Sequence, residues 1–300
     1  MSSVEIYRDL QQQINADIAG RRSAFRDDVA ALAEQRKRGD AKPSPLIVVS
    51  AGDSWFDYPL PTKGGGVTDV IESIRSRATV MPAVCNLAHH GDATTEILGQ
   101  TKRQRLIETL KAHPNAVDVI LFSGGGDDLC GDQFRYWIKD FMDGPIANYD
   151  DTLNDVLTRD ILEIVRASYE DLLVIRDKYA PNAVLVFHQY DSAYPSGIGV
   201  CRDLAGHWLI GPWLSPSLQG RGWNDRDQGQ KIVAALLKRF RDMLADLCRQ
   251  APMNYVVPTF GLLSKDQWTN ELHPSCEGFH IIADAFIGTL QAIPGFAKRI

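Results

Sequence analysis

Apolar residues recur at helical spacing over residues 4–38, a segment that is otherwise polar and charged. They stand three, four or seven positions apart, as on one face of a helix: Ile6, Leu10, Ile14, Ile18, Phe25, Val29 and Leu32. The pattern predicts a helix or helix pair packed on the body of the protein. A dimerisation arm, and with it a homo-oligomer formed through this helix, is a second interpretation. Glycine and proline between Gly39 and Pro45 break the pattern. We therefore assign residues 1–45 to an N-terminal helical extension and residues 46–300 to the main domain.

From residue 46 onward, short apolar runs alternate with longer helical stripes. The runs predict five strands, at residues 46–49, 83–87, 117–122, 183–187 and 255–257. The stripes predict helices at residues 67–74, 95–113 (one or two helices), 156–173, 232–247 and 279–286. The first run is apolar at every position, as in strands buried on both faces. The alternation indicates an α/β fold with a parallel sheet and helices on both faces.

Residues 192–223 do not follow this alternation. The segment is rich in glycine and proline and contains Trp208, Trp213 and Trp223. A loop of this length inside a compact domain is uncommon unless it is functional. It is either an insertion that covers or lines a pocket, as a lid does, or a loop packed for stability.

Composition is that of a globular protein, with 44% hydrophobic and 23% charged residues. The net charge of −6 gives no reason to expect nucleic acid or an anionic membrane as the main partner. The five cysteines are scattered and odd in number, which favours free thiols in a reducing compartment over disulfides or zinc. The polar N-terminus lacks a signal core, and no apolar stretch approaches the roughly 18 residues of a membrane span. A cytoplasmic protein without a membrane span is expected.

Polar or glycine-rich segments follow all five predicted strands. They are Gly52-Asp53-Ser54, His89-His90-Gly91-Asp92, Gly124–Asp128, His188–Asp191 and Asn270-Glu271-Leu272-His273. In parallel sheets, ligands bind beyond the carboxyl ends of the strands. The five segments are therefore expected at one edge of the sheet.

Two of these segments suggest nucleophilic catalysis by Ser54 with His273 as general base. A serine hydroxyl needs a neighbouring imidazole to take its proton as it attacks a carbonyl carbon. The oxyanion that forms needs fixed N–H donors, and the amides of Ser54 and Gly91 are candidates. The alternatives are structural. Ser54 is then a helix N-cap, and His273 is a capping residue before a helix that starts at Pro274.

The order of these segments resembles the block signature of SGNH (GDSL-type) hydrolases over residues 46–290. Gly52-Asp53-Ser54 is similar to the first block, Asn86 with Gly91 to the second, Gly125-Gly126-Asp127-Asp128 to the third and Asn270–Pro274 to the last. The resemblance implies a three-layer α/β/α, flavodoxin-like fold with a five-stranded parallel sheet. It also implies hydrolysis of a small-molecule carboxylic ester or thioester through an acyl-serine, with no metal or other cofactor.

Two positions depart from the family pattern. Asp127 stands where the family has an asparagine that donates to the oxyanion, and an ionised carboxylate only accepts hydrogen bonds. A protonated Asp127 still donates, and the charge of Asp128 favours that form. Asn270 stands at the place of the aspartate that orients the histidine, so Asp191, Asp266 and Glu271 are further candidates for that role.

The substrate-lining candidates are Trp55, His90, Asp191 and Trp268. For Trp55, Tyr58 and Trp268, burial in the core at the strand ends is an equally good interpretation. Two other function classes stay open. Asp53, Asp92, Asp127, Asp128 and several histidines suit a metal-dependent phosphoesterase, and the two departures suit a non-catalytic binding protein on a hydrolase scaffold.

Overall fold

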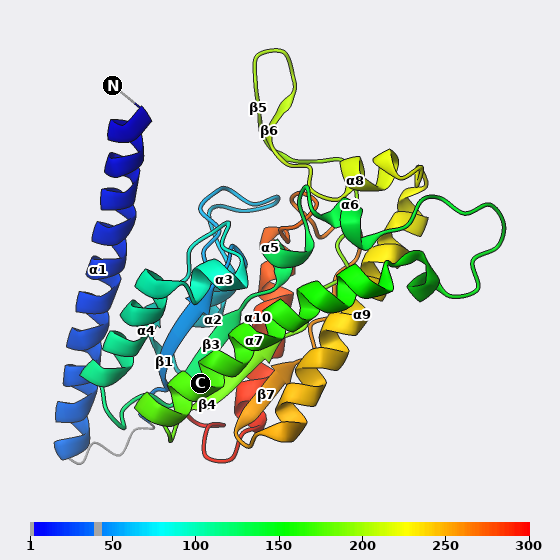
Figure 1. The fold of residues 1–300 in the computed structure, drawn as a ribbon. Helices are drawn as coiled ribbons and strands as arrows, with labels where there is room; N and C mark the ends of the chain where they lie inside the picture. The colour runs from blue at the N-terminus through cyan, green and yellow to red at the C-terminus, as the bar shows by residue number, and fades with distance from the viewer. Residues whose placement is uncertain (1–2, 39–43) are drawn as a thin grey trace.

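The computed structural model describes residues 3–38 and 44–300. A single long helix, α1 (Ser3–Lys37), precedes the main domain. The predicted break between Gly39 and Pro45 falls mostly on residues 39–43, which lie outside the described residues. Ile18 and Phe25 of α1 are buried in the common core, and α1 packs against the edge strand β2 (Ala83–Asn86). Figure 1 shows α1 along this side of the molecule.

The main sheet has five parallel strands in the order β2-β1-β3-β4-β7. The other four strands are β1 (Ile47–Gly52), β3 (Val119–Ser123), β4 (Val184–His188) and β7 (Asn254–Val257). Every residue of β1, β3 and β4 is buried, as their continuous apolar runs predict. Each predicted strand is present within a few residues of its expected bounds.

Helices cover both faces of this sheet (Figure 1). On one face, α2 (Val70–Arg77) packs against α10 (Cys276–Ala292). On the other, α7 (Asp155–Tyr179) packs against α3 (Thr94–Ile97), α4 (Gln100–Ala112) and α9 (Arg226–Gln250). The three-layer α/β/α arrangement and the strand order are those of a flavodoxin-like fold.

Several short elements lie outside the predicted alternation. Between β3 and α7 the chain forms α5 (Gly126–Leu129), α6 (Phe134–Trp137) and the 3-10 helix η1 (Tyr149–Thr152). Residues 192–223 are not a structureless loop. They contain the antiparallel hairpin of β5 (Val200–Arg202) and β6 (Trp208–Ile210), followed by α8 (Ser215–Gly220). The hairpin projects from the body in Figure 1.

Candidate active site

The candidate residues gather where the strand order reverses, between β1 and β3. Ser54 follows β1, Asp127 follows β3, and Asn270 and His273 lie between β7 and α10. A reversal of this kind opens a crevice at the carboxyl ends of the strands. The sheet thus brings these residues together from positions more than 200 residues apart in sequence.

A tight turn presents Ser54. A Cβ atom on Gly52 would lie 2.6 Å from the carbonyl oxygen of Ser123, so this close approach of β1 and β3 requires glycine. The turn is closed by the Phe56 amide, which donates to the Asp53 carbonyl at 3.1 Å. The next helix begins only at Val70, so the interpretation of Ser54 as a helix N-cap is wrong.

The capping interpretation of His273 is also wrong. Helix α10 begins at Cys276, and its N-cap is Ser275, whose side chain accepts a hydrogen bond from the Gly278 amide. His273 instead turns toward the crevice. Its Nε2 lies 2.8 Å from Ser54 Oγ, and its Nδ1 lies 2.8 Å from Asn270 Oδ1.

Asn270 fixes the tautomer of His273. Its Oδ1 also accepts hydrogen bonds from the backbone amides of Leu272 and His273, both at 3.0 Å, while its Nδ2 donates to the Tyr58 hydroxyl at 3.2 Å. These contacts prevent a flip of the amide, so Oδ1 faces the imidazole and Nδ1 must carry the proton. Nε2 is then free to accept the proton of Ser54.

The other candidates for orienting His273 form hydrogen bonds elsewhere. Glu271 is completely buried, and its carboxylate accepts hydrogen bonds from the amides of Gly197, Trp213, Leu214 and Ser215. Asp191 accepts from the amides of Ser192, Gly261 and Leu263. Asp266 accepts from the Ser264 hydroxyl. None of the three contacts the imidazole.

Aromatic rings enclose His273 and keep it neutral. Tyr58 stacks on the imidazole with ring centroids 4.3 Å apart, and Trp213 meets it edge-on at 5.7 Å. Burial, with a smaller contribution from the charge of His90, lowers the pKa of His273 to about 3. The imidazole is therefore available as a base over the whole neutral range.

The two backbone amides expected from the sequence to face an oxyanion are unpaired in the described part of the chain. Within residues 3–38 and 44–300, neither the Ser54 N–H nor the Gly91 N–H has a hydrogen-bond acceptor. Gly91 has a φ of +79°, a left-handed conformation that favours glycine. Both amides belong to loops that follow neighbouring strands, β1 and β2.

Asp127 lines the same small cavity as Ser54, and its carboxyl group is in an unusual state. Burial, reinforced by the charges of Asp53 and Asp128, raises the pKa of Asp127 well above its usual value. Its buried Oδ2 has no hydrogen-bond partner among the described residues. Asp128 is placed differently, because its carboxylate accepts from the Thr94 amide and hydroxyl, each at 2.8 Å.

Asp53 is held beneath the turn by donors. Its carboxylate accepts from the Trp55 amide at 3.0 Å, the Ser123 hydroxyl at 2.7 Å and the Tyr190 hydroxyl. Burial raises its pKa to about 6 against the effect of these donors. The three donors favour the ionised form of Asp53. When these two buried carboxyl groups hold one proton between them, Asp53 therefore carries the negative charge and Asp127 carries the proton.

An apolar cavity of about 70 Å³ opens beside Ser54 and Asp127. Of the four candidates for lining a substrate site, Trp55, Asp191 and Trp268 line this cavity, whereas His90 does not. The rest of its wall is mostly hydrocarbon, from Leu129, Cys130, Phe134, Ala193, Leu214, Val233, Leu236, Leu237 and Leu272. This wall could not be predicted from the sequence, since Leu236 and Leu237 belong to the apolar stripe of α9 and are indistinguishable there from ordinary core residues.

Two further features of the described part of the chain concern metal binding and membrane spans. It contains no group of three or more histidine, cysteine, aspartate or glutamate side chains arranged to hold a metal ion. None of its helices combines the length and apolar character needed to cross a lipid bilayer.

Comparison with known proteins reveals similarity at the level of the fold. No family model matches the sequence, and no curated protein sequence matches it. A lipase from a goat rumen metagenome aligns with a TM-score of 0.51 and 14% identity, over 81% of this chain and 97% of the lipase. Phospholipase A1 from Streptomyces albidoflavus aligns with a TM-score of 0.47 and 13% identity, over 82% and 99% of the two chains. Other aligned structures are described as a GDSL-like lipase and an SGNH hydrolase. The observed sheet order and the alignment with the goat rumen lipase confirm the predicted fold class.

Proposed function

We propose that this protein is a serine hydrolase of carboxylic esters or thioesters that works through an acyl-Ser54 intermediate. The observation that carries the proposal is the hydrogen-bonded series Ser54 Oγ, His273 Nε2, His273 Nδ1 and Asn270 Oδ1, with 2.8 Å at both links. A nucleophile, a base and an orienting group at these distances are the parts that acyl transfer requires.

In the first half-reaction, Ser54 Oγ bonds to the ester carbonyl carbon while its proton passes to His273 Nε2. The carbonyl oxygen becomes an oxyanion that accepts hydrogen bonds from the Ser54 and Gly91 amides and from protonated Asp127. When the tetrahedral intermediate collapses, the bond to the alcohol oxygen breaks and that oxygen takes the proton from Nε2. Water then repeats the sequence on the acyl-serine and releases the acid.

The cavity beside Ser54 suits a short acyl group. A volume of about 70 Å³ has room for only a few water molecules, and its wall is mostly hydrocarbon. An acetyl to butyryl chain fits this space, whereas a long fatty acyl chain does not. Short-chain esters are therefore the proposed substrate class.

A fluorophosphonate probe tests the proposal, because it phosphonylates a serine only where a base activates the hydroxyl. We expect labelling at Ser54 and turnover of p-nitrophenyl acetate in the unmodified protein, and loss of both in Ser54→Ala. His273→Ala should also lose turnover, with a circular dichroism spectrum and melting temperature near those of the parent.

Either of two outcomes would contradict the proposal. One is a folded protein that neither labels nor turns over any short-chain ester, which supports the binding-protein alternative. The other is activity that disappears with a chelator and returns with a divalent metal, which supports the phosphoesterase alternative.

A further inference from the structure

A second, larger cavity lies between α1 and the edge of the sheet. Its volume is about 600 Å³, within the range of sites that hold small molecules. One wall is the face of α1 that carries Gln13, Asp17, Arg21, Ala24 and Asp28. The opposite wall comes from the segment after β1, from the start of α2 and from the loop after β2.

This cavity reaches two residues that act directly on His273. Tyr58 lines it and also stacks on His273 at 4.3 Å. His90, whose charge acts on His273, lines it as well. The segment after β1 borders both cavities, since Ser54 and Trp55 line the small one and Asp57, Tyr58 and Pro59 the large one.

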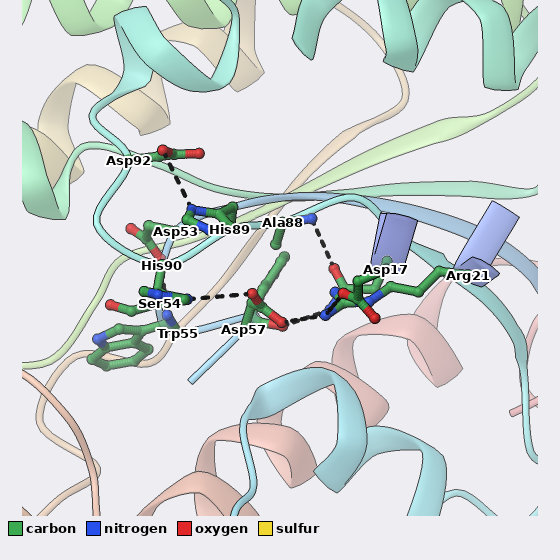
Figure 2. Close-up of polar contacts among 12 residues, drawn as sticks. Asp17, Arg21, Asp53, Ser54, Trp55, Asp57, Ala88, His89, His90 and Asp92 are labelled. Carbon is green, nitrogen blue, oxygen red and sulfur yellow. Dashed lines mark hydrogen bonds and ion pairs between the residues drawn. The ribbon is translucent and has the colours of Figure 1, made fainter. Parts of the chain in front are cut away.

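Ion pairs tie α1 to this segment. Arg21 donates to Asp57 at 2.9 Å and pairs with Asp17 at 2.7 Å, while His90 Nδ1 lies 3.6 Å from Asp57 Oδ2. Figure 2 shows Asp57 between Arg21 of α1 and His90 of the loop after β2. The helix thus contributes a wall that is connected through Asp57 to a residue beside the catalytic base.

The charges of the lining restrict what the cavity can hold. It carries five carboxyl groups, Asp17, Asp28, Asp57, Asp69 and Glu72, against two guanidinium groups, Arg21 and Arg75. Both arginines already form ion pairs, Arg21 with Asp17 and Asp57 and Arg75 with Glu72, although the buried Arg75 Nε has no acceptor among the described residues. The surplus of acceptors favours groups that donate hydrogen bonds, and the surplus of negative charge disfavours anions.

We propose that the cavity between α1 and the sheet edge binds the alcohol part of the ester, and that this alcohol is polar, rich in hydrogen-bond donors and not anionic. A polyhydroxy alcohol of monosaccharide size has this chemistry. The assignment rests on the proposed function, because it needs the ester bond at Ser54, with the acyl group in the small cavity and the alcohol in the large one.

The test compares two esters in three proteins. Ala24→Trp places an indole on the cavity wall from an exposed position, and Ala19→Trp makes the same change at an exposed position of α1 that does not line the cavity. We expect Ala24→Trp to lower kcat/KM for acetylated glucose at least about tenfold while p-nitrophenyl acetate turnover is unchanged. Ala19→Trp should match the parent with both esters. Gln13→Trp, also on the cavity wall, provides a second variant that fills the space.

A second comparison tests the charge of the site. Acetylated glucuronic acid should give a kcat/KM at least about tenfold below that of glucose acetylated at the same hydroxyl, and added salt should narrow the difference. Equal effects of Ala24→Trp and Ala19→Trp on turnover of acetylated glucose would overturn the assignment, and so would equal kcat/KM values for the neutral and the anionic ester. In either case, p-nitrophenyl acetate turnover that depends on Ser54 would leave the proposed function standing. No turnover of any of these esters would overturn both.

Discussion

Asn270 and Asp127 are the two residues at which the site departs from the block pattern, and they differ in consequence. Asn270 keeps the geometric part of the expected carboxylate's role, because its Oδ1 accepts from His273 Nδ1 and cannot be exchanged with Nδ2. What it lacks is a negative charge beside the imidazolium that the proposed mechanism forms. Asp127 keeps a donor only while it is protonated, so its contribution depends on pH.

The pH dependence of activity follows from two groups with opposite requirements. His273 must be neutral, and its lowered pKa of about 3 makes it so above that pH. Asp127 must be protonated, and burial next to Asp53 and Asp128 raises its pKa, so it keeps its proton up to that raised value. As pH increases, activity should therefore rise through the pKa of His273, about 3. It should fall again as pH increases further through the raised pKa of Asp127.

Asp127→Asn should remove the alkaline fall, because an amide donates at every pH. Above the raised pKa of Asp127, the gain should approach the value of one oxyanion donor, roughly 10²-fold in kcat. Below the raised pKa of Asp127 the variant and the parent should differ little. The measurement is a pH profile of kcat/KM for p-nitrophenyl acetate in both proteins. A profile that the substitution lowers uniformly would place Asp127 outside the oxyanion site.

At the scale of elements, the inserted segment of residues 192–223 is joined to the catalytic loop through Glu271. Its Oε1 accepts from the amides of Gly197 and Ser215, and its Oε2 from those of Trp213 and Leu214. Leu214, one of these four residues, also lines the acyl cavity. One buried carboxylate thus holds together the loop that carries His273 and a segment that contributes Leu214 to the cavity wall.

Glu271→Gln should loosen this arrangement. The new NH₂ group would face two amide N–H donors in a buried site, which we expect to destabilise the protein by about 3 kcal/mol. The free energy of unfolding in urea, together with limited proteolysis of residues 196–215, measures the effect. Asp266→Ala is the matched control, since that neighbouring carboxylate is exposed and contacts only the Ser264 side chain and nearby backbone. Parental stability and protease resistance in Glu271→Gln would contradict the anchoring role.

The sequence predicts the sheet well and the cavities poorly, for a physical reason. A strand buried on both faces is a nearly continuous apolar run, so β1, β3 and β4 can be recognised from the amino-acid sequence. Helix α9 shows one apolar stripe, although part of it packs on α7 and part lines the acyl cavity. Periodicity records that a face is buried, but not whether protein or an empty space lies against it.

The polar residues show the same limit. Ser54 and His273 were identifiable because their chemistry requires those residue types after those strands. The role of Glu271 was not, because its four partners are backbone amides of the inserted segment, and a backbone amide has no residue type to recognise. For the same reason, sequence alone left Asp191, Asp266, Glu271 and Asn270 as competing partners of His273.

On the scale of the whole molecule, α1 completes a domain whose sheet would otherwise end in an open edge. Strand β2 is the outermost strand on its side, and an uncovered edge strand offers unpaired backbone groups to other chains. Phe25 is 1% exposed and meets His113 edge-on with ring centroids 5.0 Å apart. Two polar contacts also join α1 to α4. The Arg105 guanidinium donates to Asn15 Oδ1, and Arg22 forms an ion pair with Glu108.

Phe25→Ala should therefore release α1 before it unfolds the sheet. Removing a buried phenylalanine costs about 3–5 kcal/mol, and α1 docks through one face only, so its local opening should absorb most of that loss. Hydrogen exchange should show faster exchange in α1 with protection retained in β1 and β3. Because α1 forms one wall of the large cavity, turnover of acetylated glucose should fall with it, while p-nitrophenyl acetate turnover persists. Tyr136→Ala, at a half-exposed aromatic position on α6, is the control and should change neither. Equal loss of protection in α1 and in the central strands would show that the helix and the sheet unfold as one unit.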